Sequence, residues 1–163
     1  MPESVRSLLQ AVVVFALVLA AGSATAETVA PYSGTLTADT GKPFKPFVKA
    51  LRAAIKKNKF NIVGLACANC AAKSQGVTIP GNRVFLFFRP DYAVRMLAAS
   101  TAAGIEAPIR VYVTETSGHT AQVTYRLPSH VFGAYQVTAL TEMGKELDGR
   151  VAKIIADASA ATK

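Results

Sequence analysis

Residues 109–127, IRVYVTETSGHTAQVTYRL, decide the fold of this chain. Two runs, 109–116 and 121–127, are rich in Val, Tyr and Thr, which favour β-strands. Between the runs, residues 117–120 (SGHT) are polar and include a glycine, which tight turns favour. The stretch therefore predicts an antiparallel β-hairpin with a polar tip.

The segments before the hairpin predict strands and helices in alternation. Residues 32–38 predict a short strand that ends at the turn-forming residues 39–41. Residues 60–65 predict a second strand, because four of the six are Phe, Ile, Val or Leu. Between these strands, residues 43–57 predict a helix, because apolar residues recur at helical spacing: Phe47, Val48, Leu51, Ala54 and Ile55.

Residues 83–88 are a compact apolar run that predicts a strand buried on both faces. Asp91 is expected to cap the helix that follows. After the hairpin, residues 128–134 predict a turn or short helix. Residues 138–160 predict a long helix with one apolar stripe, made of Leu140, Met143, Leu147, Val151, Ile154, Ile155 and Ala158. On the predicted solvent-exposed face of this helix, Glu146 precedes Arg150 by four residues, a spacing that favours an ion pair.

The predicted order is strand, helix, strand, small-residue segment, strand, helix, hairpin and long helix. Strands that pair antiparallel, with helices packed on one face of their sheet, define an α+β fold. The sequence has no internal repeat and no low-complexity linker. We therefore expect one domain over residues 27–163.

The N-terminal 26 residues have the features of a secretory signal peptide. A short start with Arg6 is followed by an apolar run at 11–22 and by Ala24-Thr25-Ala26. The run is shorter than the roughly 20 apolar residues that span a bilayer. We expect cleavage between Ala26 and Glu27 and a periplasmic or secreted protein.

Basic residues exceed acidic ones and give a formal charge of +8. Seven of them lie between positions 42 and 59 with no acid among them. Export removes nucleic acid as a partner, so the remaining polyanions include lipid headgroups. Four residues on one helix face are candidates for weak contact with an anionic membrane surface: Lys45, Lys49, Arg52 and Lys56. The alternative is that they are the solvated face of the helix.

Several short motifs, taken in order, resemble the DUF302 domain family. They are residues 76–80 (GVTIP), the strand at 84–88 before Pro90, residues 103–111 (AGIEAPIRV) and residues 125–128 (YRLP). The resemblance covers about positions 33–160. It implies an α+β fold like that of the TATA-box-binding-protein class, is compatible with a homodimer, and points to a family whose biochemical role is not established. The chain differs from the family pattern at residues 67–72, where relatives often carry a histidine, and at residues 88–90.

Both cysteines of the chain, Cys67 and Cys70, are separated by two residues. The pair has three interpretations. A local disulfide is favoured outside the cytoplasm and would close a very short loop. A redox-active pair would need a thiol with a lowered pKa at a helix start, and Lys73 could contribute charge there. Reduced, the two thiolates could bind a soft metal ion such as Cu(I).

Zinc in a closed structural site takes four protein ligands, so a metal site here needs further donors. The candidates are His119, His130, Met96 and, with less support, Met143. Copper or zinc therefore stays open as a cofactor. Covalent haem of the c type is not expected, because Ala71 rather than His follows Cys70.

Catalytic signatures are absent from the sequence: it has no Gly-x-Ser-x-Gly elbow, His-Glu-x-x-His pair or glycine-rich phosphate loop. Ser129 and His130 are adjacent in sequence, which says nothing about contact between their side chains. We therefore expect a module that binds a ligand or a protein partner and has no catalytic centre. The alternative is a thiol–disulfide redox protein or a soft-metal binding protein that uses Cys67 and Cys70.

Overall fold

The computed structural model describes residues 31–162. The chain separates into two compact units, Met1–Pro31 and Tyr32–Lys163, and all elements below belong to the second. The predicted signal peptide and its cleavage site between Ala26 and Glu27 lie outside the described residues. Among residues 31–162, no helix combines the length and the apolar character needed to cross a bilayer.

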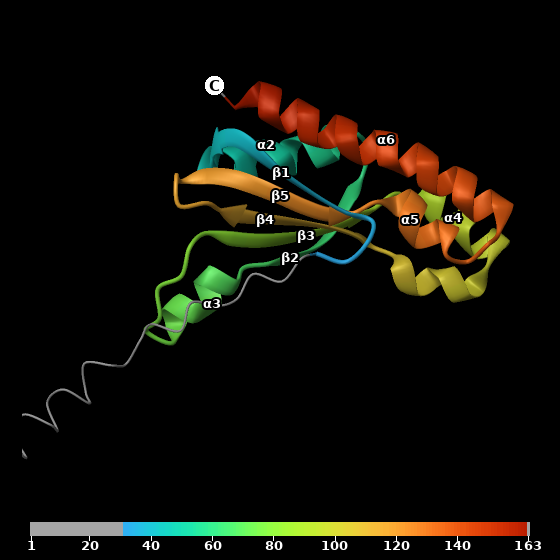
Figure 1. Ribbon diagram of the computed structural model, residues 1–163, viewed down its shortest axis with the longest axis horizontal. Coiled ribbons are helices and arrows are strands. Elements are labelled where there is room, and N and C mark those ends of the chain that lie inside the picture. Colours follow the sequence, from blue (N-terminus) through green and yellow to red (C-terminus); the bar gives the residue numbers. More distant parts are fainter. Residues whose placement is uncertain (1–30, 163) are drawn as a thin grey trace, which may run out of the picture. The chain divides into compact units, whose positions relative to one another are not determined.

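Five antiparallel strands form one sheet in the order β1-β5-β4-β3-β2, and the hairpin β4–β5 supplies its central strand, β4 (Figure 1). The predicted α+β class and the hairpin are confirmed. In chain order the elements are β1 (Thr35–Pro43), α2 (Phe44–Lys57), β2 (Asn61–Ala66), α3 (Ala68–Ser74), β3 (Asn82–Phe88), α4 (Pro90–Ala99), η1 (Thr101–Glu106), β4 (Ile109–Glu115), β5 (Thr120–Arg126), α5 (Pro128–Gly133) and α6 (Thr138–Ala161).

Helices cover one face of the sheet, and α2 and α6 run across it side by side (Figure 1). The core lies between these layers. From the helices it takes Phe47, Leu51 and Ile55 of α2 and the predicted stripe of α6, of which only Ile155 is half-buried. From the sheet it takes residues that share the covered face, namely Phe85, Phe87, Val111, Val113, Ala121 and Val123. The opposite face, called the open face below, has no helix on it among the described residues.

The first strand is longer than predicted. β1 pairs with β5 from Thr35–Arg126 through Asp39–Gln122 and again at Pro43–Thr120. The predicted turn at 39–41 is wrong, because this segment is an irregularity inside the strand. Gly41 adopts a φ of 63°, and the Thr40 hydroxyl donates to the Ala121 carbonyl at 2.7 Å. Pairing with β5 outweighs the local turn preference of Asp and Gly.

The prediction that residues 83–88 are buried on both faces is also wrong. Phe85 and Phe87 are fully buried, whereas Val84 and Leu86, which alternate with them along the strand, are half-buried. β3 lies inside the sheet, but only the helical layer covers it. The uniform apolar run therefore places apolar side chains on the open face as well.

Local interactions at the helices differ from the predictions in three places. The segment that starts between the two cysteines and includes Cys70 forms a short helix, α3. Asp91 does not cap α4 from the preceding position. It lies in the first turn and forms an ion pair with Arg89, the residue before the helix. Glu146 pairs across helices with Arg95 at 2.8 Å rather than along α6 with Arg150.

Candidate functional site

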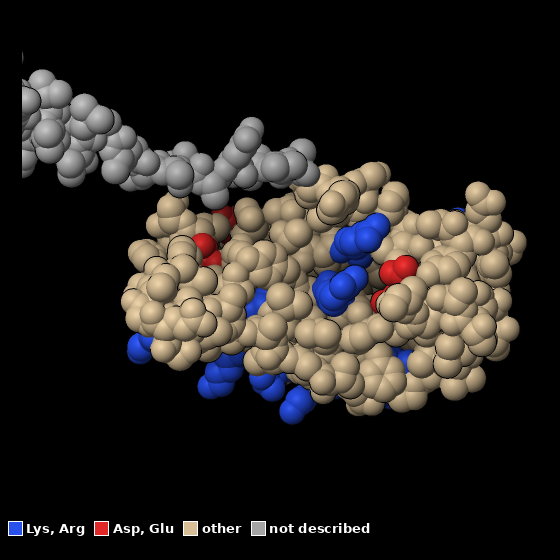
Figure 2. All heavy atoms as spheres, turned by 90° about the horizontal axis from the view of Figure 1, so that it is seen from below, with Lys and Arg blue, Asp and Glu red and all other residues tan. Residues whose placement is uncertain are grey.

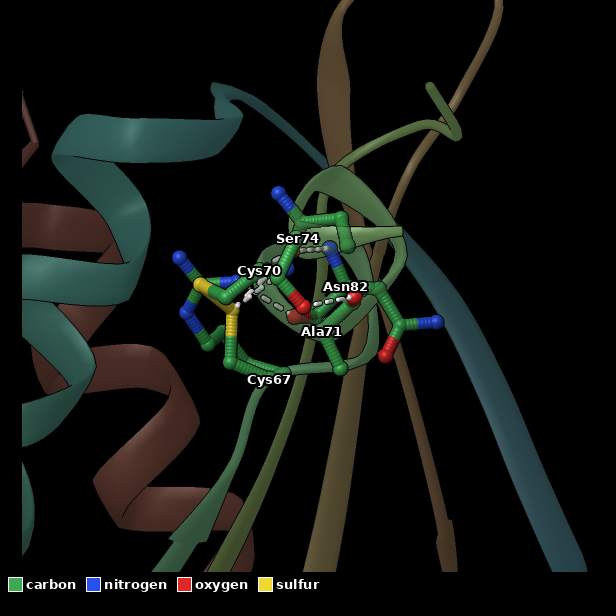
Figure 3. Close-up of a disulfide and its surroundings, with 7 residues drawn as sticks. Cys67, Cys70, Ala71, Ser74 and Asn82 are labelled. Atoms are coloured by element: carbon green, nitrogen blue, oxygen red, sulfur yellow. Dashed lines mark hydrogen bonds between the residues drawn. A yellow bond between two sulfur atoms is a disulfide. The ribbon is translucent and has the colours of Figure 1, made fainter. Parts of the chain in front are cut away.

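Cys67 and Cys70 are joined by a disulfide, with their Cα atoms 5.3 Å apart (Figure 3). Cys67 is the residue before α3, and its sulfur accepts a hydrogen bond from the Cys70 backbone N–H at 3.1 Å. Within the helix, the Ser74 hydroxyl donates to the Ala71 carbonyl at 2.7 Å. Cys70 is exposed and Cys67 is half-buried, so solvent reaches one end of the bridge.

Asn69, between the two cysteines, ties this loop to the start of β3. Its Oδ1 accepts hydrogen bonds from the Asn82 backbone N–H at 3.2 Å and from the Arg83 guanidinium. The Arg83 guanidinium also lies 6.0 Å from the centre of the Phe44 ring. No residue of α3 is buried. Side-chain hydrogen bonds, rather than apolar packing, therefore hold the disulfide loop against the sheet.

The other metal candidates lie in separate environments. Met96 and Met143 are in the core, with 4% and 2% exposure. His119 is at the exposed tip of the β4–β5 hairpin, 3.1 Å from Glu115, and His130 is in α5. Among residues 31–162, no three His, Cys, Asp or Glu side chains come together as metal ligands. The structure therefore does not join the histidines to the cysteine pair.

The four predicted anion-binding residues of α2 form one exposed stripe. Lys45, Lys49, Arg52 and Lys56 recur every three or four positions and all face solvent. The stripe ends at Lys57 and Asn58, where α2 terminates. Basic residues in a last helical turn favour the helix itself, because they lie near its exposed carbonyls.

A second group of polar side chains gathers where η1, β4, β5 and α5 meet. Two adjoining hollows of about 270 and 50 Å³ share Glu106, Arg126 and Val131. We call the two together the recess. Polar residues surround its wider part: Glu106, Arg126, His130 and Tyr135. The narrower part adds Arg110 and apolar walls, which are Pro108, Ile109, Pro128 and Phe132.

The two arginines of the recess lie on the open face. Tyr112 of β4 pairs with Thr124 of β5, and Arg110 and Arg126 are each two residues further along their strands on the same face. Both are exposed, and within residues 31–162 neither takes part in a salt bridge. Figure 2 views the molecule from below and shows basic and acidic side chains meeting on one part of this surface. Like charges opposite one another in a sheet are unfavourable without a counter-charge.

Two contacts organise the rest of the recess. The Tyr135 hydroxyl donates to Glu106 Oε1 at 3.1 Å. Desolvation, this hydrogen bond and the charge of Glu106 all raise the pKa of Tyr135. The His130 ring packs on Gly34, where an added Cβ would lie 2.1 Å from the ring. Gly34 has a φ of 74°, so both its conformation and the close approach of His130 favour glycine.

Of this group, sequence reasoning named only His130 as a candidate ligand, and it took Glu106 to be a solvated acid near a predicted strand end. A signal for the arginines was present, because pairing the predicted hairpin about its polar tip places Arg110 and Arg126 on one face. Glu106 and Tyr135 had no such signal. They come from η1 and from the residues after α5, and only the folded chain brings them together.

The geometry defines a small α+β domain with one antiparallel sheet, a helical layer on one face, an exposed disulfide loop and a polar recess. The family described as "Domain of unknown function DUF302" matches residues 35–158, and the chain belongs to this family. It is also similar in structure to an uncharacterized conserved DUF302 protein from Bacillus stearothermophilus. That similarity has a TM-score of 0.69 at 16% identity, and it covers 77% of this chain and 98% of the other. No curated protein has a sequence that matches this chain.

Proposed function

We propose that the protein is an exported ligand-binding module without a catalytic centre, and that the recess holds its ligand. One observation carries the proposal: Arg110 and Arg126 lie side by side at the recess, two cations to the single carboxylate of Glu106, and neither forms a salt bridge among residues 31–162. Their mutual repulsion is relieved when an anion binds between them. Repulsion between the two arginines destabilises the folded protein. Their position at the recess therefore favours a role in ligand binding over a purely structural one.

The recess suits a small carboxylate with an apolar part. A carboxylate can accept two parallel hydrogen bonds from a guanidinium, which lets Arg126 hold and orient it. The apolar part fits against Ile109 and Phe132 in the narrower hollow of about 50 Å³. The Tyr135 hydroxyl donates a hydrogen bond to Glu106 and orients its carboxylate. That carboxylate can accept a hydrogen bond from a donor group on the ligand.

A binding role without catalysis agrees with how the nucleophilic side chains are arranged. Across residues 31–162, no serine, threonine or cysteine side chain hydrogen-bonds to a histidine. His119 instead contacts Glu115, whose Oε2 accepts from the Gly81 backbone at 2.9 Å. The Gly81 and His119 hydrogen bonds lower the pKa of Glu115, which suits a structural acceptor better than a general base.

The test is a ¹⁵N NMR titration of the purified protein with benzoate and, as a neutral control of the same shape, benzamide. We expect saturable shifts at residues of η1, β4, β5 and α5 with benzoate and much weaker ones with benzamide. Arg126→Gln should weaken benzoate binding about tenfold, because it removes a charge-assisted pair of hydrogen bonds. The matched control Arg52→Gln, on the outer face of α2, should bind like the wild type.

Equal binding of benzoate and benzamide would refute the role of the arginines. Shifts confined to other surfaces, or an unchanged affinity in Arg126→Gln, would refute the recess as the site. Export has its own test: after expression of the full chain, N-terminal sequencing of the periplasmic or secreted fraction should begin at Glu27. An intact Met1 would contradict it.

A second candidate function uses the cysteine pair and is favoured by the exposure of Cys70. In this role a partner dithiol transfers two electrons and two protons to the disulfide and becomes a disulfide itself. A reduction potential well above about −300 mV would support exchange, and a lower one a structural bridge. Copper or zinc binding by the reduced form is the related alternative. It requires stoichiometric metal that is lost in the Cys67→Ser/Cys70→Ser double variant.

A further inference from the structure

A second hollow, separate from the recess, lies where α2 ends and α4 begins, beside α6. It encloses about 700 Å³ and is lined by Lys57, Lys59, Arg89, Asp91 and Arg150 among others. We call it the basic hollow. Four cations and one carboxylate line it, so its local charge is strongly positive.

The carboxylates around the basic hollow are already engaged. Arg150 and Lys57 act electrostatically on Glu146 and Asp157, respectively, yet neither forms an ion pair with them. Each carboxylate has another basic partner: Asp91 binds Arg89 at 2.5 Å, Glu146 binds Arg95 at 2.8 Å, and Asp157 binds Lys153 at 3.0 Å. Within residues 31–162, this leaves Lys57, Lys59 and Arg150 without salt-bridge partners.

Lys59 holds an unusual backbone conformation at this site. The end of α2 is closed by hydrogen bonds from Lys59 N–H to the Lys56 carbonyl at 2.9 Å and from Phe60 N–H to the Ile55 carbonyl at 3.1 Å. This Schellman pattern places Lys59 at the position where glycine is favoured, with a φ of 64°. A residue with a Cβ is less stable than glycine in that conformation. Lysine at this position therefore lowers the stability of the folded protein.

We propose that the basic hollow binds a phosphate-bearing polyanion through Lys57, Lys59 and Arg150. Three cations without salt-bridge partners around one concavity match a ligand with several negative charges better than a single carboxylate. The hollow is wide, and every residue that lines it except Pro90 is charged or polar, which suits a hydrated anion. The exposed stripe of Lys45, Lys49, Arg52 and Lys56 leads to the hollow along α2 and attracts anions toward it.

A phosphate-bearing polyanion could be either a free polyphosphate or the phosphate groups of a lipid surface. Both offer closely spaced anionic oxygens to the same three residues. The experiment therefore uses one soluble probe and one membrane probe with the same set of variants. It does not depend on the recess, because none of the three residues lines it.

The soluble probe is sodium tripolyphosphate, titrated into the ¹⁵N-labelled protein, with sulfate at equal ionic strength as the control anion. We expect saturable shifts at residues 57–59, 89, 91 and 150. Lys59→Gly should weaken binding about fivefold through the lost charge and should also raise Tm by about 3 °C through the relieved backbone. A loss of affinity together with a rise in Tm would show that Lys59 serves ligand binding rather than stability. Arg150→Gln should weaken binding similarly, whereas Lys145→Gln, at an exposed lysine of α6 that does not line the basic hollow, should not.

Unchanged affinity in both Lys59→Gly and Arg150→Gln would overturn the proposal, as would unsaturable shifts spread over every surface lysine. Absence of tripolyphosphate binding would also overturn it. The membrane arm then identifies the source. Binding to phosphatidylglycerol vesicles that tripolyphosphate displaces and Lys59→Gly weakens points to a lipid surface, whereas tripolyphosphate binding without vesicle binding points to a free polyanion.

Discussion

On the covered face of the sheet, Phe85, Phe87 and Val123 are fully buried, whereas on the open face Leu86 and Tyr112 keep contact with solvent. The strands are the same, and only the helical layer distinguishes their two faces. Burial of apolar surface is the main favourable term in folding, so most of the stability resides on the covered face. The open face is thereby free to carry unpaired charges, and the recess begins there.

Replacing one residue on each face gives the largest predicted difference. Phe87 packs edge-on against Phe60 with ring centres 5.5 Å apart and is fully buried. Phe87→Ala should lower the free energy of unfolding by about 3–5 kcal/mol, because it leaves a cavity in the core. Leu86→Ala, on the open face, should lower it by about 1 kcal/mol. Urea unfolding measures both. Equal losses would mean that the open face is covered in solution.

Two glycines of α6 test how closely the helical layer is packed. A Cβ on Gly144 would lie 2.8 Å from the Ser129 Cα of α5, whereas one on Gly149 would meet nothing within 4 Å. Gly144→Ala should lower the free energy of unfolding by about 1–3 kcal/mol through overpacking. Gly149→Ala, the matched control, should raise it by up to about 1 kcal/mol through helix propensity. Thermal unfolding gives both signs, and a neutral Gly144→Ala would contradict the close α5–α6 contact.

The disulfide loop should matter little to the stability of the sheet. It closes a very short loop, and α3 contributes no buried residue. The Cys67→Ser/Cys70→Ser double variant should lower the free energy of unfolding by about 1 kcal/mol or less, at the small end of the range for disulfides. Hydrogen exchange should accelerate in α3 and stay unchanged in β3 and β4. Faster exchange throughout the sheet would show that the bridge supports the core.

The smallest predicted effect concerns an ion pair on the outer surface of the helical layer. A hydrogen bond from Arg95 is the main reason why the pKa of Glu146 lies below its ordinary value of 4.5. A carboxylate with a lowered folded pKa adds stability above its unfolded pKa and loses that contribution as pH falls through the folded pKa. The Tm advantage of wild type over Glu146→Gln should therefore be present at neutral pH, begin to decline near pH 4.5 and vanish as pH falls through the lower pKa of the folded state.

The control for that ion pair is Glu142→Gln, also on α6, since Glu142 has no salt-bridge partner within residues 31–162. It should show no such pH-dependent difference. An advantage of wild type over Glu146→Gln that persists at acid pH would mean that Glu146 stabilises the protein by packing rather than by charge.

Elements with strong local patterns were predictable from the sequence. The hairpin and α6 follow from periods of two and about 3.6 residues, and the structure places them where those periods indicated. The errors occur where long-range pairing decides. The segment at 39–41 is drawn into β1 by β5, and Glu146 finds Arg95 on another helix instead of Arg150 on its own.

The candidate sites divide in the same way. Cys67 and Cys70 were recognisable because they are neighbours in sequence, and α3 holds them together. The recess and the basic hollow each draw on several elements that are distant along the chain. Lys59 was visible as one of seven basic residues, but its left-handed conformation depends on how α2 ends against the strand that follows.

The sequence alone therefore determined the α+β class, the hairpin, the long helix and the position of the cysteine pair. Each of these depends on interactions between residues close in the chain, so composition and period suffice. Only the tertiary structure decided that one face of the sheet is open, that Arg110 and Arg126 share a recess with Glu106, and that Lys59 and Arg150 line one hollow. These features arise when elements distant in the sequence pack together. The periodicity of the sequence cannot show which charged side chains lack a partner after that packing.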